Sequence, residues 1–398
     1  MEFKLRPLIL TVYLPAFLTA MSIGMLAPII PAKVDLIGGT VFVIGLAVGA
    51  RGLGEAIFSI PTGLLIIKLG NKNTMLLGMI GMSVFALLSG ITDNNLILYI
   101  WLFCLGIFYG FFSLSRHSFL TQIVPRAFRG KAFSRFGGIN RIGWFFGPVI
   151  GGFTAGSIGV NIPFYIVATI SLLTTFIILF GHDPSSYINA NGHVDKTPES
   201  TLNTFKAHKQ SFAIGGTAQF IMQFLRECRH VLIPVWAFSI GLEVEQLGII
   251  QSLSSAIDMT LFYPVGIVMD RFGRKWTSLP SILLLATGFI IMTSVDSFTG
   301  LLLVSLLLGF ANGLGSGAML TLGADLSPSI NPSAFLGIWR VFGWTGNSAG
   351  GPVSGGIAQL FGLTASSLVV AAIGLVGVGI FAFLIPETLS KKQNNPIH

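Results

Sequence analysis

The segment Gly266–Lys275, with the sequence GIVMDRFGRK, places one acidic and three basic side chains directly between two long apolar runs. These side chains belong to Asp270, Arg271, Arg274 and Lys275, in a chain of which only 10% is charged. A short charged segment between apolar runs of helical length is typical of a loop at a membrane surface. The segment therefore predicts that the apolar runs on either side of it cross a membrane.

The composition of the whole chain agrees with this prediction. Hydrophobic residues make up 53% of its 398 residues, and 34 Phe stand against 15 Asp plus Glu. A soluble protein of this size needs far more charge on its surface. Apolar runs of the roughly 20 residues that span a bilayer recur along nearly the whole chain. We therefore predict a polytopic membrane protein, and its first run, too long for a cleavable signal peptide, is predicted to be a retained helix.

The two cysteines, Cys104 and Cys228, lie within apolar runs and far from any metal-ligand spacing. They are predicted to be packing residues without a disulfide. No metal site and no cofactor are predicted.

The apolar runs predict twelve transmembrane helices in two groups of six. The first group is placed at about 8–32, 41–68, 73–92, 95–122, 131–157 and 162–181, and the second at about 211–239, 246–270, 275–295, 298–323, 334–360 and 364–386. A polar stretch separates the groups, so the predicted organisation is an N-terminal bundle (1–181), a cytoplasmic linker (182–210) and a C-terminal bundle with a short cytoplasmic tail (211–398).

Basic residues in the loops predict the orientation in the membrane. One set of loops holds about fifteen Lys and Arg residues, whereas the opposite set holds only Lys33. Basic loops stay on the cytoplasmic side, so both termini and the linker are predicted to be cytoplasmic, in an inner or plasma membrane. The same bias explains the net charge of +8, and no nucleic-acid partner is needed to account for it.

The two halves resemble each other in sequence. PTGLLIIKLGNKNTMLLG at 61–78 corresponds to YPVGIVMDRFGRKWTSLP at 263–280, and GWFFGPVIGG at 143–152 corresponds to GNSAGGPVSGG at 346–356. An internal repeat with matching loops suggests two bundles that move about a central site, as in alternating-access transport.

The loop pattern carries a family resemblance. Gly266, Asp270, Arg271, Gly273, Arg274 and Lys275 match the pattern G-x-x-x-D-R-x-G-R-K, which resembles the signature loop of the major facilitator superfamily. Gly147, Pro148, Gly151 and Gly152 resemble the helix-five motif of that superfamily's drug:proton antiporters. The resemblance implies an all-α membrane fold with twelve transmembrane helices in two pseudo-symmetric six-helix bundles.

The loop is also expected to help close the cytoplasmic side. Its glycines permit a tight turn, and Asp270 is placed to meet the positive end of a neighbouring helix, which the resemblance implies is helix five. Asp325 is a candidate partner for Arg271 or Arg274. The alternative is that these charges only anchor the helix ends. In the first half Ile67 stands where the acid is expected, so the predicted gate is asymmetric.

Glycines in helices five and eleven predict close packing. Gly143, Gly147 and Gly151 repeat at four-residue spacing and form a groove for a neighbouring helix. Pro148 is expected to bend helix five, and Gly351 and Pro352 do likewise in helix eleven. Either these helices pivot during transport or they only pack tightly.

Charged residues within predicted spans are costly in lipid and are expected to face a cavity or a partner. Arg51 and Glu55 stand at i and i+4 and are expected to pair, either structurally or in function. Glu55 is also a candidate proton carrier. Arg226, Arg229 and His230 share one face of helix seven with Glu227 beside them, and are expected to line a cavity.

Further charges lie in the other spans. Arg116, His117 and Arg141 are candidate pathway residues in helices four and five, whereas Arg135 and Arg340 are expected to reach the headgroups. The basic residue and Gln that exporters of the superfamily carry early in helix four are missing, with Phe103 and Leu105 at about those places. Asp258, in the middle of helix eight, is either the counter-charge of Arg226 or Arg229 or a proton site.

These charges predict the substrate class. Five arginines against three acids leave a positive surplus, which favours anionic or zwitterionic amphiphiles over organic cations. We predict a monomeric secondary transporter that exchanges small molecules for protons across the lipid bilayer, and neither an enzyme nor an ATP-driven pump. The alternatives are a proton-coupled importer of an organic anion or metal chelate and, in another class, a non-transporting membrane receptor.

Overall fold

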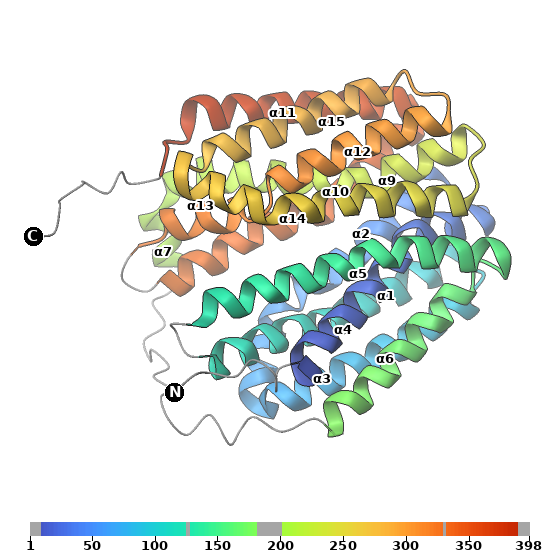
Figure 1. The fold of residues 1–398 in the computed structure, drawn as a ribbon, viewed down its shortest axis with the longest axis horizontal. Helices are drawn as coiled ribbons and strands as arrows, with labels where there is room; N and C mark the ends of the chain where they lie inside the picture. The colour runs from blue at the N-terminus through green and yellow to red at the C-terminus, as the bar shows by residue number, and fades with distance from the viewer. Residues whose placement is uncertain (1–8, 125–127, 181–200, 329–331, 389–398) are drawn as a thin grey trace, which may run out of the picture.

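The computed structural model describes residues 9–124, 128–180, 201–328 and 332–388. It is an all-helical bundle (Figure 1). The first half contains η1 (Ile9–Tyr13), α1 (Leu14–Leu36), α2 (Val41–Ile57), α3 (Ser59–Ile91), α4 (Asn95–Ile123), α5 (Arg129–Ser157) and α6 (Ile162–Phe180).

The second and third spans join without a long loop. The helix is interrupted at Phe58, between α2 and α3, so the second span consists of α2 and the start of α3. Gly70 then turns the chain with φ 80° and ψ 166°, a conformation that glycine adopts without strain. The rest of α3 is the third span.

The second half begins with short helices and continues in long ones. It contains α7 (Thr201–Ala207), α8 (Lys209–Ser211), η4 (Phe212–Gly216), α9 (Thr217–Ser239), α10 (Val244–Phe272), α11 (Lys275–Met292), α12 (Phe298–Leu314), α13 (Ala318–Leu326), α14 (Pro332–Phe361), α15 (Leu363–Gly379) and η5 (Ile380–Leu384).

Two local predictions differ from the structure. The helix predicted over 298–323 is broken between α12 and α13, because Gly317 takes a left-handed conformation with φ 75°. The predicted linker is partly helical, since α7 and α8 occupy 201–211; residues 182–200 lie outside the described part of the chain.

The loops fall at two ends of the molecule, which we name by their glycines. The Gly273 end holds the turns at Gly70 and Gly273, and the Gly38 end holds those at Gly38, Gly159, Gly241 and Gly362, all with positive φ. Three helices that start at the Gly38 end have side-chain caps on their backbone N–H groups: Thr40 caps α2, Asn94 caps α4 and Ser297 caps α12. These caps fix where the spans turn back.

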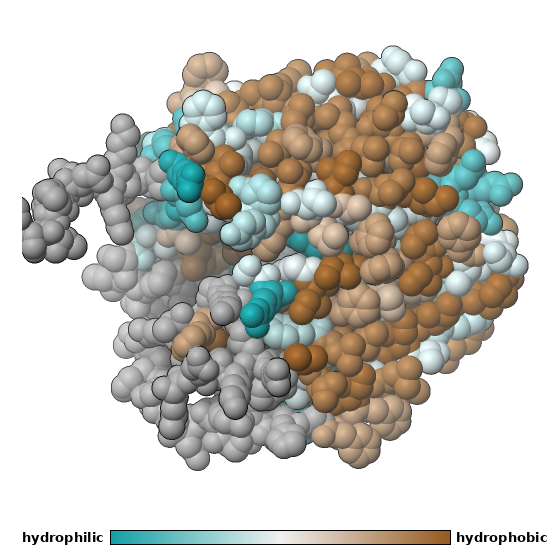
Figure 2. Space-filling model, in the orientation of Figure 1, coloured by the Kyte–Doolittle hydropathy of each residue, from teal (hydrophilic) through white to brown (hydrophobic). Residues whose placement is uncertain are grey.

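The surface between the two ends is apolar, as lipid contact requires. Eight helices of the described chain are long and apolar enough to cross a membrane. Figure 2 shows hydrophobic side chains over the middle of the molecule and hydrophilic ones gathered toward its ends. The other long helices, α2, α5, α9 and α14, carry charges within them and lie where the two bundles meet.

Each half has its own buried core. The buried apolar cluster of the first half contains residues from Val12 to Ile178, together with two side chains of α9 from the second half. The cluster of the second half contains residues from Phe212 to Ile385. The halves meet through two helix pairs, α2 with α14 and α5 with α10. Figure 1 shows these pairs between the two bundles.

At the Gly38 end the two bundles touch backbone to backbone. A β-carbon added at Gly45 of α2 would lie 2.9 Å from the carbonyl carbon of Gly351 in α14. A β-carbon at Gly152 of α5 would lie 2.8 Å from the oxygen of Val244 in α10. Only glycine permits such an approach, so this end is closed by glycine packing.

At the Gly273 end, α3, α5, α10 and α14 each carry a glycine with open space beside it. A β-carbon added at Gly63, Gly138, Gly266 or Gly337 would meet no atom of the described chain within 4 Å. A β-carbon at Gly137 of α5 would still lie 3.1 Å from the Phe262 ring of α10, so these two helices remain in contact, while a cavity lies between the bundles on the side of the Gly273 end.

Candidate functional site

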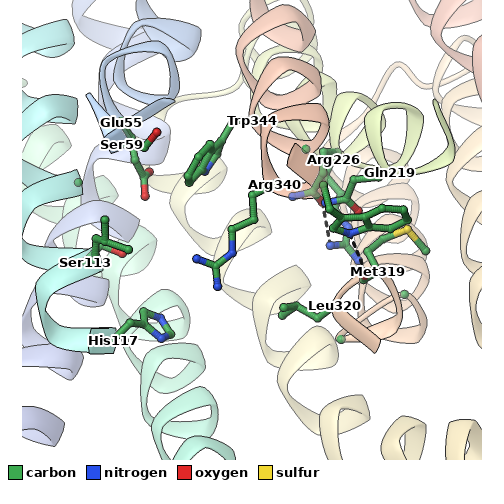
Figure 3. A pocket seen from close by; sticks show the side chains of 17 residues that line it. Glu55, Ser59, Ser113, His117, Gln219, Arg226, Met319, Leu320, Arg340 and Trp344 are labelled. Atoms are coloured by element: carbon green, nitrogen blue, oxygen red, sulfur yellow. Dashed lines mark hydrogen bonds between the residues drawn. The ribbon is translucent and has the colours of Figure 1, made fainter. Parts of the chain in front are cut away.

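The main cavity lies between the bundles on the side of the Gly273 end and has a volume of about 330 Å³. One wall belongs to the first bundle and the other to the second (Figure 3). The first wall is formed by Glu55, Ser59, Gly110, Ser113, Leu114 and His117, and the second by Gln219, Gln223, Arg226, Gly315, Gly317, Met319, Leu320, Trp339, Arg340, Gly343 and Trp344.

Two smaller cavities of about 20 and 30 Å³ lie between the main cavity and the Gly38 end. Both are lined by Trp144 and His230, whose rings are 5.9 Å apart. Arg229 lines one of them, and Arg51 and Glu227 line the other. The small cavities are therefore lined by four of the residues predicted for the pathway, Arg51, Glu227, Arg229 and His230.

An ion pair crosses the bundle interface between α5 and α10. Arg141 Nη1 lies 2.6 Å from Asp258 Oδ2, and its Nη2 donates to the hydroxyl of Ser316. The guanidinium also lies 4.6 Å from the centroid of the Phe262 ring. One of the two alternatives for Asp258 was that it neutralises Arg226 or Arg229. Its ion pair is instead with Arg141, because the interface brings α5 directly against α10.

The predicted pair of Arg51 and Glu55 does not form. No ion pair within 4.0 Å joins these two residues, both of which the structure describes. Arg51 lies 5.6 Å from the ring centroid of Tyr109 and lines a small cavity, whereas Glu55 lines the main one. A basic residue four positions before an acidic one is the weaker order for pairing on a helix, and helical side chains lean toward the N-terminus, so Arg51 leans away from Glu55.

The two neighbours Arg116 and His117 on α4 are placed differently. Arg116 is only 3% exposed, and its guanidinium carbon lies 4.6 Å from the ring centroids of both Phe112 and Phe136. It does not line the main cavity. His117 does line it, and its ring stacks on Phe133 at 5.9 Å.

Arg340 was expected to reach the headgroups, but it lines the cavity. Figure 3 shows it extending from α14 into the space between the two walls, with His117 and Ser113 on one side and Leu320 on the other. Its position along the helix indicated only its depth in the membrane. Depth does not distinguish a lipid-facing side chain from one that faces a water-filled space.

Sequence reasoning also missed the aromatic and amide residues of the second wall. Trp339 is buried and donates from Nε1 to the oxygen of Met319 at 3.1 Å, which fixes its ring. Trp344 and Gln219 line the cavity beside it. The presence of both Trp339 and Trp344 on α14 could have indicated this wall in the sequence. Aromatic residues are common in all the spans, however, so these two did not stand out.

The loop around Gly273 is tied to its own bundle. Arg274 Nε lies 2.8 Å from Asp325 Oδ2, so of the two expected partners of Asp325 the structure selects Arg274. The carboxylate of Glu387 accepts from the backbone N–H groups of Arg274 at 2.9 Å and Lys275 at 3.0 Å, where α11 begins. This acid was not among the predicted residues, and it stabilises the positive end of that helix.

The other predicted gate residues make fewer contacts. Asp270 and Arg271 are exposed, and neither has an ion pair with a described residue. Residues 125–127, which precede the start of α5, lie outside the described part, so contact of Asp270 with the start of that helix stays a prediction. Gly266 faces open space.

The glycine motifs pack as expected and do so in two directions. A β-carbon at Gly143 would lie 2.8 Å from Met21 N, and one at Gly151 would lie 3.1 Å from Met25 Cα, so this groove holds α1 within the bundle. Gly152 instead faces α10 across the interface. In α14, Gly350 packs on α9, whereas Gly351 faces α2. Pro148 and Pro352 both lie inside their helices at this level.

Comparison with known families identifies the fold. The family model of the Major Facilitator Superfamily matches residues 12–225 and 215–397, which together cover both bundles. The chain belongs to this superfamily. It is therefore an integral membrane protein and a transporter, not an enzyme.

Curated relatives agree with this assignment. An uncharacterized MFS-type transporter of Methanocaldococcus jannaschii is 22% identical over 382 residues, which are 96% of this chain and 98% of the relative. The quinolone resistance protein NorA of Staphylococcus aureus is 29% identical over 177 residues, or 44% of this chain and 45% of that protein.

Solved structures share the fold at low sequence identity. A bacterial homologue of the human lysosomal transporter Spinster, in an inward-facing and occupied conformation, matches with a TM-score of 0.79 and 15% identity, over 96% of this chain and 97% of that one. The nucleoside transporter NupG matches with a TM-score of 0.77 and 15% identity, over 94% and 98%. The twelve-span, two-bundle architecture is thus confirmed.

Proposed function

We propose that this transporter exports amphiphilic organic solutes with an anionic group in exchange for protons, by alternating access. The observation that carries the proposal is the contrast between the two ends of the interface. Glycine contacts close the Gly38 end, and a charged cavity lies between the bundles toward the Gly273 end. This is the arrangement of a secondary transporter open to one side of the membrane.

The charge of the loops supports a cytoplasmic Gly273 end. Lys68, Lys72, Arg271, Arg274 and Lys275 flank its turns at Gly70 and Gly273, whereas the Gly38 end carries one lysine near its loops. Basic residues favour the cytoplasmic side. In this orientation the cavity faces the cytoplasm, in the cytoplasmic membrane, and the protein works as a single chain.

The charges beside the cavity support an anionic group on the solute. Arg226 and Arg340 line the cavity, against Glu55 as its single acid among the residues described. Fixed positive charge in a low-dielectric space attracts anions. The similarity to NorA, a quinolone resistance protein, covers less than half of each chain and supports export.

Two acids are candidates for proton coupling. Asp258 holds the bundles together through Arg141, so its protonation would release an interface contact. Glu55 faces the cavity and so is accessible to the solute. Protonation of a group that makes different contacts in two conformations shifts their populations, and the ion pair of Asp258 with Arg141 across the interface makes it the stronger candidate.

The test uses purified protein in liposomes with an imposed pH gradient. A fluorescent aromatic sulfonate and a fluorescent quaternary amine of similar size are the two probes. We expect gradient-dependent movement of the anion, at least about tenfold faster than that of the cation, and no movement when an ionophore collapses the gradient. Anion flux that ignores the gradient would refute proton coupling, and preference for the cation would refute the substrate class.

A further inference from the structure

The two walls of the main cavity carry opposite charges. Glu55 stands on the wall of the first bundle with the hydroxyls of Ser59 and Ser113 near it, and Arg226 and Arg340 stand on the wall of the second (Figure 3). Each sign therefore belongs to a different moving body. A solute that binds in the middle of the cavity meets an acid on one side and guanidinium groups on the other.

The charges that face the cavity are not neutralised within the protein. Across the part of the chain that the structure describes, no ion pair within 4.0 Å involves Glu55, Arg226 or Arg340. Arg226 donates to Gln223 Oε1 at 3.0 Å and to the oxygen of Asn312 at 3.5 Å, which are neutral acceptors, and its buried Nε has no partner. These groups are available to a bound ion.

Closure of the cavity makes single-charge solutes unfavourable. A plain anion would satisfy the arginines, but it would leave the Glu55 carboxylate enclosed without a counter-charge. A plain cation would satisfy Glu55 and leave two guanidinium groups enclosed instead. An enclosed unpaired charge costs far more than a paired one, so a solute with both charges is the one that both walls can close upon.

We propose that the cavity binds an amphiphilic zwitterion across the two bundles, with its cationic group at Glu55 and its anionic group at Arg340 and Arg226. This inference rests on the proposed transport function and names the substrate class of the same site. The apolar body of the solute packs on Trp344 and Trp339, which both line the cavity, and Trp339 is held in place by its bond to Met319.

The arrangement also links binding to movement. A zwitterion that contacts both walls attracts each bundle toward the other, so its affinity rises as the cavity closes. A ligand shifts a conformational equilibrium by its difference in affinity for the two states. A solute that contacts only one wall differs much less in its affinity for the two states.

The test measures binding without transport, so that it does not depend on coupling or direction. Full-length protein in lipid nanodiscs is given one aromatic dipeptide, phenylalanyl-alanine, in three forms: the free zwitterion, the N-acetylated anion and the C-amidated cation. Radiolabelled zwitterion is displaced by each form at neutral pH. We expect the zwitterion to bind about tenfold or more tightly than either single-charge form.

Two variants assign the charges to the walls. Glu55→Gln should raise the affinity for the anion, whose binding no longer leaves an unpaired carboxylate, and lower the affinity for the zwitterion, so that the preference for the zwitterion is lost. Arg340→Gln should reduce the affinity for the zwitterion to that for the cation. Arg135→Gln, on the exposed side of α5, and Asp296→Asn, in an exposed loop, are the matched controls and should change neither value. Gel filtration and thermal unfolding check that each variant is folded.

The inference is overturned if the anion binds wild type as well as the zwitterion does, if Glu55→Gln keeps the preference for the zwitterion, or if no form binds at millimolar concentration. A protein that moves the sulfonate with the pH gradient but shows no zwitterion preference would keep the proposed function and lose this inference. A clear preference for the zwitterion without gradient-driven flux would support this inference and contradict the proposed function.

Discussion

The two ends of the bundle interface are built from the same four helices but from different residues. Toward the Gly38 end, α2 and α14 meet through Gly45, Gly351 and Gly355, with backbone atoms in contact. Toward the Gly273 end, the same two helices carry Glu55 and Arg340, and the cavity lies between them. The Gly38 end is closed by direct contact between its own residues, whereas the Gly273 end needs a ligand between its walls.

The difference shows why closing the two ends is not equivalent. Glycine contacts need no ligand, because close packing of backbone stabilises them directly. The charged end places an acid and two arginines on opposite walls of a cavity, and a solute of matching charge can fill that cavity. We therefore expect the state closed at the Gly38 end to be the favoured one when no solute is bound.

The largest effect is expected from breaking the glycine contact. Gly45→Val should separate the bundles at the Gly38 end, because its side chain would meet the backbone of Gly351. Overpacking of this kind costs about 1–3 kcal/mol, so transport should fall roughly tenfold or more. Spin labels at Asp35→Cys and Ser294→Cys, on exposed positions of the two bundles, should show a longer distance.

The matched controls for this substitution lie toward the other end, one in α3, which continues the second span, and one in α14. Gly63→Val and Gly337→Val add the same side chain where a β-carbon meets no described atom within 4 Å. Neither should change the distance between the labels. Equal lengthening in all three variants would mean that helix stability, rather than the interface contact, is responsible.

A smaller effect is expected at the ion pair that lies between the two ends. Asp258→Asn should weaken the state closed at the Gly38 end by about 2 kcal/mol, less than for a fully buried pair, because the Arg141 and Asp258 side chains are 20% and 18% exposed. The labels described above would report a mixture of distances. Arg141→Gln combined with Asp258→Asn should be less harmful than the sum of the two, since no unpaired arginine then remains at that site.

The control for this pair is Arg135→Gln, an exposed arginine of the same helix. It should leave the distance distribution as in wild type. Strictly additive effects of Arg141→Gln and Asp258→Asn would show that the two side chains do not stabilise each other, and the interface contact would then have no part in the conformational preference.

The fold was accessible from sequence because membrane helices are specified by local composition. Apolar length located the spans to within a few residues, and the Gly70 and Gly273 turns were visible as charged, glycine-containing loops. The break between α12 and α13 falls at Gly315, Ser316 and Gly317, but glycines also occur within the unbroken membrane helices, so these residues did not predict it. A left-handed glycine such as Gly317 depends on tertiary packing, which composition does not reveal.

The candidate site was only partly accessible, because charge partners depend on which helices meet. Local spacing predicted a pair of Arg51 and Glu55, whereas the pair that forms joins Arg141 to Asp258 across 117 residues of chain. Depth in the membrane placed Arg340 at the headgroups, although its helix faces the other bundle. Sequence located the charges within the spans, but assigning them to a wall or a partner required the interface.

The smallest effect is expected at the Gly38 end, where Lys33 was counted only as a loop charge. Its side chain is fully buried, and Nζ donates to Asp93 Oδ1 at 2.9 Å and to Asn161 Oδ1 at 2.7 Å. Asp93→Asn should lower the free energy of unfolding by about 1 kcal/mol, a modest value because the Asp93 side chain is 79% exposed. Lys33→Met should cost less, because it removes the buried charge together with the need for a partner.

Thermal unfolding in detergent measures this difference, with Asp35→Asn, an exposed acid at the same end, as the control. The order of the melting temperatures is the informative result. If Lys33→Met were the more damaging change, the lysine would stabilise this end through its own contacts, and the closed end would depend on charge as well as on glycine. The expected order instead leaves glycine packing as the reason why the Gly38 end closes without a ligand.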